Sequence, residues 1–255
     1  MTLSKSEIIS FQKYGWVGSY QLLNESQITS IFEEYNNYKN NFTNSGQLLK
    51  KQVNTNQNIW FKSAHAHLPK LFDLVSSQII IDKIRPILGN DIIAWGCCLL
   101  ERVPGQEHRW HVDVEHHQWG GVSVFVGLRG IKPDSSLTVL NGSHHLDDSP
   151  QNLSINSELQ LREVCTAKGI PYSIQNVNLK AGEFFLFHGL LWHASKNLTN
   201  EARYSLIIQY SKPDAEVDIP LNWDFPIQWA KAKPPCVLVS GVDKFGINNI
   251  ISRPT

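Results

Sequence analysis

The sequence has no excess charge of either sign, little cysteine and no long hydrophobic run, and each absence excludes a class of protein. Lysine plus arginine and aspartate plus glutamate number 23 each, so the basic surplus typical of nucleic-acid or membrane-surface binding is missing. The four cysteines (Cys97, Cys98, Cys165 and Cys236) fit neither a disulfide framework nor a zinc-site spacing. Nothing approaches the ~18 apolar residues of a membrane span, and no apolar leader follows Met1. We therefore expect a cytoplasmic protein, monomeric or homodimeric, whose partner is a small molecule.

Helical patterns dominate the first 90 residues, and short β-type runs dominate the remainder of the chain. Helices are predicted at residues 5–14, after Asn24, at 69–75 and at 77–88; Asn24 and Gln27 resemble a capping box. The polar segment 39–58 is expected to be a surface loop, either a lid or a simple solvated loop. Strands are predicted at residues 16–22, 92–103, 122–128, 137–140, 183–188 and 204–210. The pattern predicts one mainly-β domain over 1–255: a mostly helical part (1–90), a sandwich or jelly-roll core (91–212) and a packing tail (213–255).

His111-x-Asp113 comes after a strand-like run and the Pro104-Gly105 turn. If the segment is a strand, side chains two residues apart point to the same face. One imidazole and one carboxylate on one face supply two ligands of the 2-His-1-carboxylate triad, which leaves open coordination positions on Fe(II). A lone His-x-Asp is more often a surface turn or a hydrogen-bonded pair than a metal site, so the third ligand decides between them.

Two histidines downstream compete for the third ligand position. His188 ends an apolar strand, and His193 comes after a short connection. Further along, Arg203 and Ser205 share one face of the last strong strand. An arginine inside an apolar barrel needs an anionic partner, and a small dicarboxylate that chelates iron would satisfy it. The other interpretation of Arg203 is a surface arginine on an edge strand.

The chain resembles the phytanoyl-CoA dioxygenase family of Fe(II)/2-oxoglutarate oxygenases. The matching segments are Phe11 to Trp16, His111-x-Asp113, Leu137-x-x-x-Asn141-Gly142-Ser143-His144 (with Asn141 where the family has proline), Gly182-Glu183 to His188, and Arg203. His193-x-Ser195-x-Asn197 resembles the family's His-x-Ser-x-x-Asn, here one residue tighter. Together these motifs span most of the chain.

The resemblance implies a double-stranded β-helix, the cupin-like jelly-roll barrel, with packing helices at its N-terminal side. It implies iron held by His111, Asp113 and His193 rather than His188. It also implies 2-oxoglutarate anchored by Arg203 with the help of Ser195 or Ser205, and O2 as the second co-substrate. Because Asp113 is present, there is no room for a halide ligand. Hydroxylation with release of succinate and CO2 is therefore the expected outcome, and desaturation or ring formation the alternative.

The substrate is the least determined part. Trp110, His108 and Trp192 flank the predicted ligands and are candidates for substrate contact, as are Trp60 and Trp119. No cluster of lysine and arginine suits the phosphates of a CoA thioester, which favours a small polar metabolite, a natural product or a sugar-linked compound. His144-His145 with Asp147-Asp148 resembles a second metal site, but the Gly-Ser-His turn explains His144 structurally.

Two functions from other classes compete with the oxygenase. A non-catalytic jelly-roll binding protein would have no need for His111, Asp113, His193 and Arg203 together. A cupin-like metalloenzyme that uses no keto acid would be expected to show His-x-His at the first metal strand, where this chain has His-x-Asp.

Overall fold

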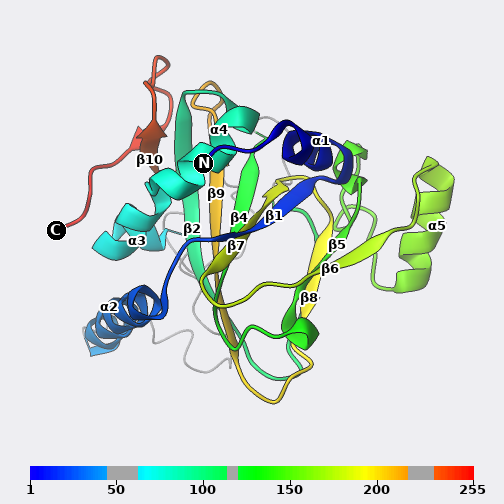
Figure 1. The fold of residues 1–255 in the computed structure, drawn as a ribbon, viewed down its shortest axis with the longest axis horizontal. Helices are drawn as coiled ribbons and strands as arrows, with labels where there is room; N and C mark the ends of the chain where they lie inside the picture. Colours follow the sequence, from blue (N-terminus) through cyan, green and yellow to red (C-terminus); the bar gives the residue numbers. More distant parts are fainter. Residues whose placement is uncertain (45–62, 114–119, 218–232) are drawn as a thin grey trace.

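Two β-sheets form the body of the molecule, and helices pack on their outer faces (Figure 1). The structure, a computed structural model, describes residues 1–44, 63–113, 120–217 and 233–255, and for 39–44 the backbone alone. The larger sheet has the strand order β1-β7-β4-β9-β2-β10-β11, and the smaller has the order β3-β8-β5-β6. Neighbouring strands pair antiparallel, apart from the parallel pair β10–β11. The predicted mainly-β, jelly-roll fold is confirmed.

The strands and helices begin and end at well-defined residues. The larger sheet contains β1 (Trp16–Gln21), β2 (Ile92–Arg102), β4 (Val122–Arg129), β7 (Glu183–His188), β9 (Arg203–Ser211), β10 (Pro235–Ser240) and β11 (Asn249–Ile250). The smaller sheet contains β3 (Glu107–His111), β5 (Leu137–Leu140), β6 (Ile174–Val177) and β8 (His193–Lys196). The helices are α1 (Lys5–Tyr14), α2 (Glu25–Asn44), α3 (Pro69–Val75), α4 (Gln78–Leu88) and α5 (Glu158–Lys168).

The larger sheet is buried on both faces, which explains why its strands read as continuous apolar runs. On β4, Val122 and Val124 belong to the cluster under helices α1 to α4, whereas Phe125 belongs to the cluster between the sheets. The same alternation puts Cys97 and Cys98 on opposite faces, as predicted for adjacent strand residues. The interior between the sheets is thus mainly apolar, and the few polar side chains within it call for an explanation.

The smaller sheet has its own outer layer. Helix α5, which lies beside β5 and β6 in Figure 1, packs Leu161 and Cys165 against Leu140 and Trp192. This helix lies in segment 151–171, between strands β5 and β6. Among the described residues, no helix is both long and apolar enough to cross a membrane.

The local signals at the N-terminus are borne out, and two expectations need correction. The Asn24 and Gln27 side chains each accept the other's backbone N–H at 2.9 Å, so the capping box is confirmed. Helix α2 continues to Asn44, so the prediction that a loop begins at residue 39 is wrong. The remainder of the predicted loop, residues 45–58, lies outside the described part. Residues 235–240 do more than pack over the barrel, because they form β10 and pair with β2.

Candidate metal centre

His111 and His193 lie opposite each other on neighbouring strands of the smaller sheet. Strand β3 ends at His111, β8 begins at His193, and the two residues are register partners. Both rings point into the interior between the sheets, with their centroids 4.0 Å apart. The structure therefore brings His193 to the predicted ligand pair. His188 lies elsewhere, beside the rings of Phe11 and His144.

Each imidazole is oriented by a backbone carbonyl two residues before it. Nδ1 of His111 lies 2.7 Å from the carbonyl oxygen of Arg109, and Nδ1 of His193 lies 2.8 Å from that of Leu191. A carbonyl oxygen only accepts, so Nδ1 carries the hydrogen and Nε2 offers its lone pair. This is the outer hydrogen bond that fixes the tautomer and orientation of histidine ligands in metal sites.

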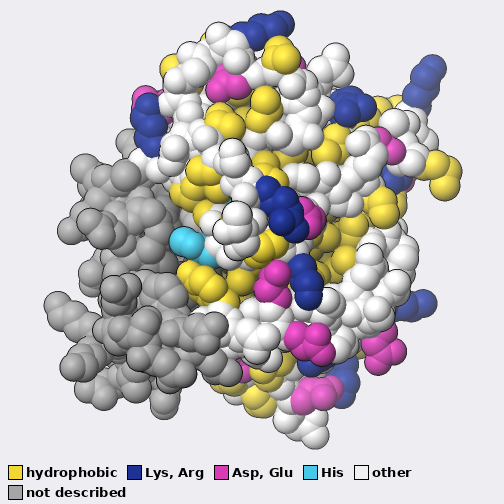
Figure 2. All heavy atoms as spheres, turned by 90° about the vertical axis from the view of Figure 1, so that its left-hand side faces the viewer, with side chains coloured by type: hydrophobic (Ala, Val, Ile, Leu, Met, Phe, Trp, Pro, Cys, Tyr) yellow, Lys and Arg dark blue, Asp and Glu magenta, His cyan; other side chains and the backbone are white. Residues whose placement is uncertain are grey.

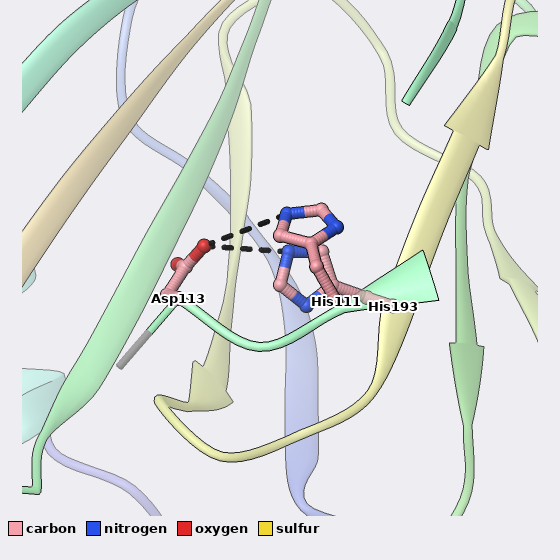
Figure 3. A group of neighbouring side chains, drawn as sticks. All are labelled: His111, Asp113 and His193. Carbon is pink, nitrogen blue, oxygen red and sulfur yellow. Dashed lines mark ion pairs between the residues drawn. The ribbon is translucent and has the colours of Figure 1, made fainter. Parts of the chain in front are cut away.

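Asp113 completes the group from the turn after β3. Its backbone N–H donates to the carbonyl of Gly189 at 3.1 Å, which ties this turn to the connection that leads to His193. Its Oδ1 lies 3.4 Å from Nε2 of His193 and 3.9 Å from Nε2 of His111 (Figure 3). All three ligand atoms lie within 4.8 Å of one another. Donors on one face of an octahedral ion are ~3 Å apart, so this set fits a metal ion with little adjustment.

Ser123 on β4 fixes the other carboxylate oxygen. Its Oγ donates to Oδ2 of Asp113 at 2.5 Å, so Oδ1 is the oxygen that faces the two imidazoles. Sequence reasoning missed Ser123, because its role depends on β4 and the turn after β3 meeting across the interior. Its position in an otherwise apolar run, Val122 to Leu128, was the available hint.

Burial and mutual contact set the charge of the group. Burial, together with the nearby His193, lowers the pKa of His111 well below its ordinary value, so this imidazole is neutral. Burial alone would raise the pKa of Asp113, but the adjoining imidazoles and the Ser123 hydrogen bond outweigh it and hold that pKa below its ordinary range. A neutral imidazole and an ionised carboxylate are the forms that bind metal ions.

Arg203 lies in the same interior and is only 2% exposed. One Nη donates to the carbonyl of Ser135, and the other lies 3.4 Å from Oγ of Ser195. Its Nε is buried without a hydrogen-bond partner among the described residues. Burial lowers the pKa of Arg203 to about 10, which leaves it a cation near neutral pH. An anion binding here would meet a partly unsatisfied guanidinium with a serine hydroxyl beside it.

Ser205, the other serine predicted to help Arg203, shares that interior face and is fully buried. Its Oγ has no hydrogen-bond partner within the described ranges. Ser195 is thus the serine in contact with Arg203, and Ser205 is a neighbour on the same face.

A β-bulge in β3 places His108 on the ligand side. The register runs His108↔Ser195 and then His111↔His193, so β3 has one residue more than β8 between these two pairs. Two side chains three residues apart therefore face the same way. The centroids of the His108 and His111 rings are 3.8 Å apart. Burial and the nearby Arg102 lower the pKa of His108 to about 3. The structure thus brings His108, a predicted substrate contact, next to the ligands.

The two tryptophans predicted to contact substrate lie on the other side of the smaller sheet. Trp192 is fully buried in the cluster under α5, and its Nε1 donates to the carbonyl of Asp148 at 3.1 Å. Trp110 packs against the same cluster. Each precedes an inward-pointing histidine, and strand alternation sends it to the opposite face. Trp192 is therefore a core residue, and the partly exposed Trp110 packs against that core on the face of the sheet away from the ligands. Trp60 and Trp119 lie outside the described residues.

The Gly-Ser-His turn has the structural role expected of it. Gly142 has φ 77°, and the Ser143 hydroxyl donates to the carbonyl of Leu140 and accepts the N–H of Trp192. His144 and His145 both point at the carbonyl of Gln12 at the end of α1. In the described part of the chain, the group His111, Asp113 and His193 is the one cluster suited to a metal ion.

Sequence reasoning missed Arg102, and it named Asn197 only as part of the motif that begins at His193. Arg102 is the last residue of β2, is 6% exposed, and pairs in register with Arg203. The side chain of Asn197 donates to the carbonyls of Arg102 and Glu201 and accepts from Thr199. Asn197 thereby joins the ends of β2 and β9, where the two arginines lie.

Comparison with known proteins identifies the family. The family model for Phytanoyl-CoA dioxygenase (PhyH) matches residues 11–205. No curated protein matches the chain.

Solved structures resemble the whole chain. EctD from S. alaskensis with 2-oxoglutarate and 5-hydroxyectoine is 18% identical, with 98% of this chain and 87% of that chain covered and a TM-score of 0.69. CytC3 with Fe(II) and alpha-ketoglutarate is 19% identical, with 98% and 93% covered and a TM-score of 0.64. SnoK, a non-heme alpha ketoglutarate dependent carbocyclase from nogalamycin biosynthesis, is 15% identical, with 91% and 92% covered and a TM-score of 0.67. At these identities the likeness establishes a shared fold.

Proposed function

The chain belongs to the phytanoyl-CoA dioxygenase family, and from this we propose that it is a non-haem Fe(II)- and 2-oxoglutarate-dependent oxygenase. The proposed reaction is hydroxylation of a small polar metabolite, a natural product or a sugar-linked compound, with release of succinate and CO2. The observation that carries this proposal is the convergence of His111, Asp113 and His193 in an interior that also holds the buried cation Arg203.

Iron would be held by Nε2 of the two histidines and Oδ1 of Asp113, which supply two neutral donors and one negative charge. The residual positive charge of the ion attracts a dianionic keto acid, whose distal carboxylate would be held by Arg203 and Ser195. When bound, iron and 2-oxoglutarate together supply the oxidising chemistry that inserts oxygen into a C–H bond.

The protein's own contribution is to orient these groups and to exclude water. The Arg109 and Leu191 carbonyls and the Ser123 hydroxyl hold the three ligands in position. Phe125 lies below the guanidinium of Arg203, and Phe187 packs edge-on against His193, so apolar surface surrounds the polar cluster. A dry site strengthens the charge interactions made within it.

A small-molecule substrate is consistent with the outer surface. On the face drawn in Figure 2, basic and acidic side chains are interspersed among polar and apolar ones. The described part of this face therefore offers no single-sign field to recruit a polyanion. Asp113 completes the ligand set and leaves no position for a halide, so hydroxylation is the proposed outcome. Desaturation or ring formation is the alternative, and SnoK is a carbocyclase on the same fold.

The proposal is tested by adding Fe(II) and 2-oxoglutarate to the protein without oxygen. Chelation of iron by the keto acid should give a weak charge-transfer band in the visible, and His111→Ala should abolish it. Arg203→Leu should raise the dissociation constant of 2-oxoglutarate by roughly 10- to 100-fold, the worth of a charge-assisted hydrogen-bond pair, with little change in iron affinity. Arg162→Leu, which removes an exposed arginine of α5, is the matched control.

The absence of a band in iron-loaded wild-type protein would overturn the proposal. It would favour either the non-catalytic jelly-roll binding protein or a metalloenzyme that uses no keto acid. Equal loss of iron and 2-oxoglutarate binding in Arg203→Leu would make Arg203 a structural residue.

A further inference from the structure

The interior contains a second buried arginine that the proposed function does not use. Resting on that function, we propose that the primary substrate carries a carboxylate group, and that Arg102 binds it. Arg102 thereby determines specificity, while Arg203 serves the co-substrate.

Arg102 faces the interior between the sheets. It continues the face of β2 that carries Cys98 and Leu100, both members of the cluster between the sheets. One Nη donates to the carbonyl of Glu101 at 3.2 Å, and the Nε is buried without a hydrogen-bond partner among the described residues. The guanidinium therefore has a buried N–H donor that no described residue satisfies.

The charge of Arg102 is not balanced by the part of the chain that the structure describes. Neither Arg102 nor Arg203 forms an ion pair with a described carboxylate. The adjacent Glu101 directs its side chain to the hydroxyl of Tyr204 instead. Arg102 and Arg203 are register partners, and like charges directly opposite each other on neighbouring strands repel. Two adjacent buried cations without a fixed counter-ion are an arrangement that binding of anions would stabilise.

Two rows of polar side chains lead from the metal ligands to this pair of arginines. Along β8, His193 is followed by Ser195, whose hydroxyl contacts Arg203. Along β3, the ring of His111 lies against that of His108, and the register partner of His108 is Ser195, the serine beside Arg203. The cross-strand pairs His193–His111 and Ser195–His108 keep the two rows side by side. The row on β8 suits the co-substrate, because it ends at Arg203. The row on β3 runs beside it and is placed to bind another ligand.

A charge count favours a single negative charge on that ligand. The charges of Fe(II), Asp113 and the chelating carboxylate of 2-oxoglutarate sum to zero. The distal carboxylate of 2-oxoglutarate balances the charge of Arg203. The charge of Arg102 remains, and one carboxylate would neutralise it. A phosphate monoester carries about −1.5 to −2 at pH 7 and would leave an excess of negative charge.

The test uses a library of small carboxylic acids, each paired with its methyl ester and primary amide, and a second arm of phosphate monoesters. Succinate release reports turnover, and calorimetry without oxygen reports binding to protein loaded with Fe(II) and 2-oxoglutarate. At least one acid should bind and stimulate turnover about tenfold or more over its ester and amide. Arg102→Leu should remove that preference, and Arg102→Lys should retain part of it.

Two further measurements separate substrate binding by Arg102 from co-substrate binding and from a purely structural role. The dissociation constant of 2-oxoglutarate, read from the visible band, should change less than about threefold in Arg102→Leu but strongly in Arg203→Leu. Metal-free Arg102→Leu should melt no lower than wild type, because an unpaired buried charge is replaced by an apolar side chain. A purely structural arginine would instead lower the melting temperature.

Five outcomes would overturn the inference while the visible band stays intact: equal loss of 2-oxoglutarate affinity in both variants, a lower melting temperature of metal-free Arg102→Leu, preference for esters or amides, stimulation by phosphate monoesters alone, or no response to any acid. Loss of the band in wild-type protein would instead contradict the proposed function, so the two failures are distinguishable.

Discussion

At the scale of single residues, Ser123 shows how much of the metal centre depends on side chains that would not touch the metal. The hydroxyl of Ser123 holds Oδ2 of Asp113, and this contact decides which carboxylate oxygen faces the histidines. Without it, the carboxylate could rotate about its last torsion, and the ligand set would lose its preorganised geometry.

We expect Ser123→Ala to weaken iron binding by roughly 10- to 100-fold, the usual effect of removing a hydrogen bond to a ligand. Anaerobic titration of Fe(II) against a competing chelator measures the change. Ser211→Ala is the matched control, since Ser211 is also buried in the larger sheet but its Oγ has no hydrogen-bond partner among the described residues. Equal losses in both variants would mean that Ser123 acts through packing alone.

Residue types and spacing predicted His111 and Asp113 as a ligand pair but left His188 and His193 as alternatives for the third ligand. The resemblance to the family selected His193, which the structure places beside the pair. Ser123 and Arg102 could not be predicted, since serine and arginine are common and their roles appear only where distant strands meet. Trp192 was misassigned for the opposite reason: closeness in sequence to His193 suggested closeness in space, and strand alternation separates the two.

At the scale of elements, the turn between β8 and β9 holds the arginine end of the interior together. The fully enclosed side chain of Asn197 donates to the carbonyls of Arg102 at 2.7 Å and Glu201 at 2.8 Å. Its Oδ1 accepts the N–H and the hydroxyl of Thr199. The side-chain amide of Asn197 therefore forms hydrogen bonds with Arg102, Thr199 and Glu201 together.

Asn197→Ala should lower the free energy of unfolding by about 2–4 kcal/mol, because several buried polar groups lose their partners together. Urea denaturation followed by circular dichroism measures this. The same variant should weaken 2-oxoglutarate binding, since the ends of β2 and β9 would no longer be tied. Asn176→Ala, at an exposed position of β6, should cost less than about 0.5 kcal/mol. A stable Asn197→Ala protein would show that the turn is held by its strands alone.

Strand bounds were predictable where a run is apolar and bounded by turn residues: residues 137–140 and 183–188 match β5 and β7 in full. The bulge in β3 was not, because a period of two predicts opposite faces for His108 and His111, and the extra residue cancels that rule. Strand β10, which pairs with β2, was missed because it is short and begins at Pro235, a residue that argues against a strand.

At the scale of the whole molecule, the N-terminal and C-terminal parts are joined by a buried histidine. His65, in the short helical turn at Ala64–Ala66, is fully buried, and its Nε2 donates to the carbonyl of Pro235 at the start of β10 at 3.0 Å. Burial lowers the pKa of His65 to about 4. Other histidines have pKa values lowered mainly by burial, namely His67, His108, His111, His144 and His188.

The sign of the resulting pH dependence is set by proton uptake. An unfolded histidine takes up a proton near pH 6.5, whereas the folded state resists protonation of these side chains until lower pH. The unfolded chain therefore binds more protons below pH 6.5, and the stability present above that pH is lost as the pH falls towards 4. Each such histidine adds about 1.4 kcal/mol per pH unit to the slope within this window.

We accordingly expect the metal-free protein to be most stable above pH 7 and to unfold cooperatively between about pH 6 and pH 4. His65→Gln keeps a donor for the Pro235 carbonyl but removes the titrating group. It should therefore reduce the slope of unfolding free energy against pH by about 1.4 kcal/mol per unit between pH 6.5 and 4. Urea denaturation in the presence of a chelator, repeated from pH 8 to pH 5, measures both slopes. Comparison at pH 8, where both side chains are neutral, isolates any packing cost of the substitution. An unchanged slope in His65→Gln would show that the junction between His65 and β10 does not sense acid, and would leave the acid sensitivity to the other histidines whose pKa values burial lowers.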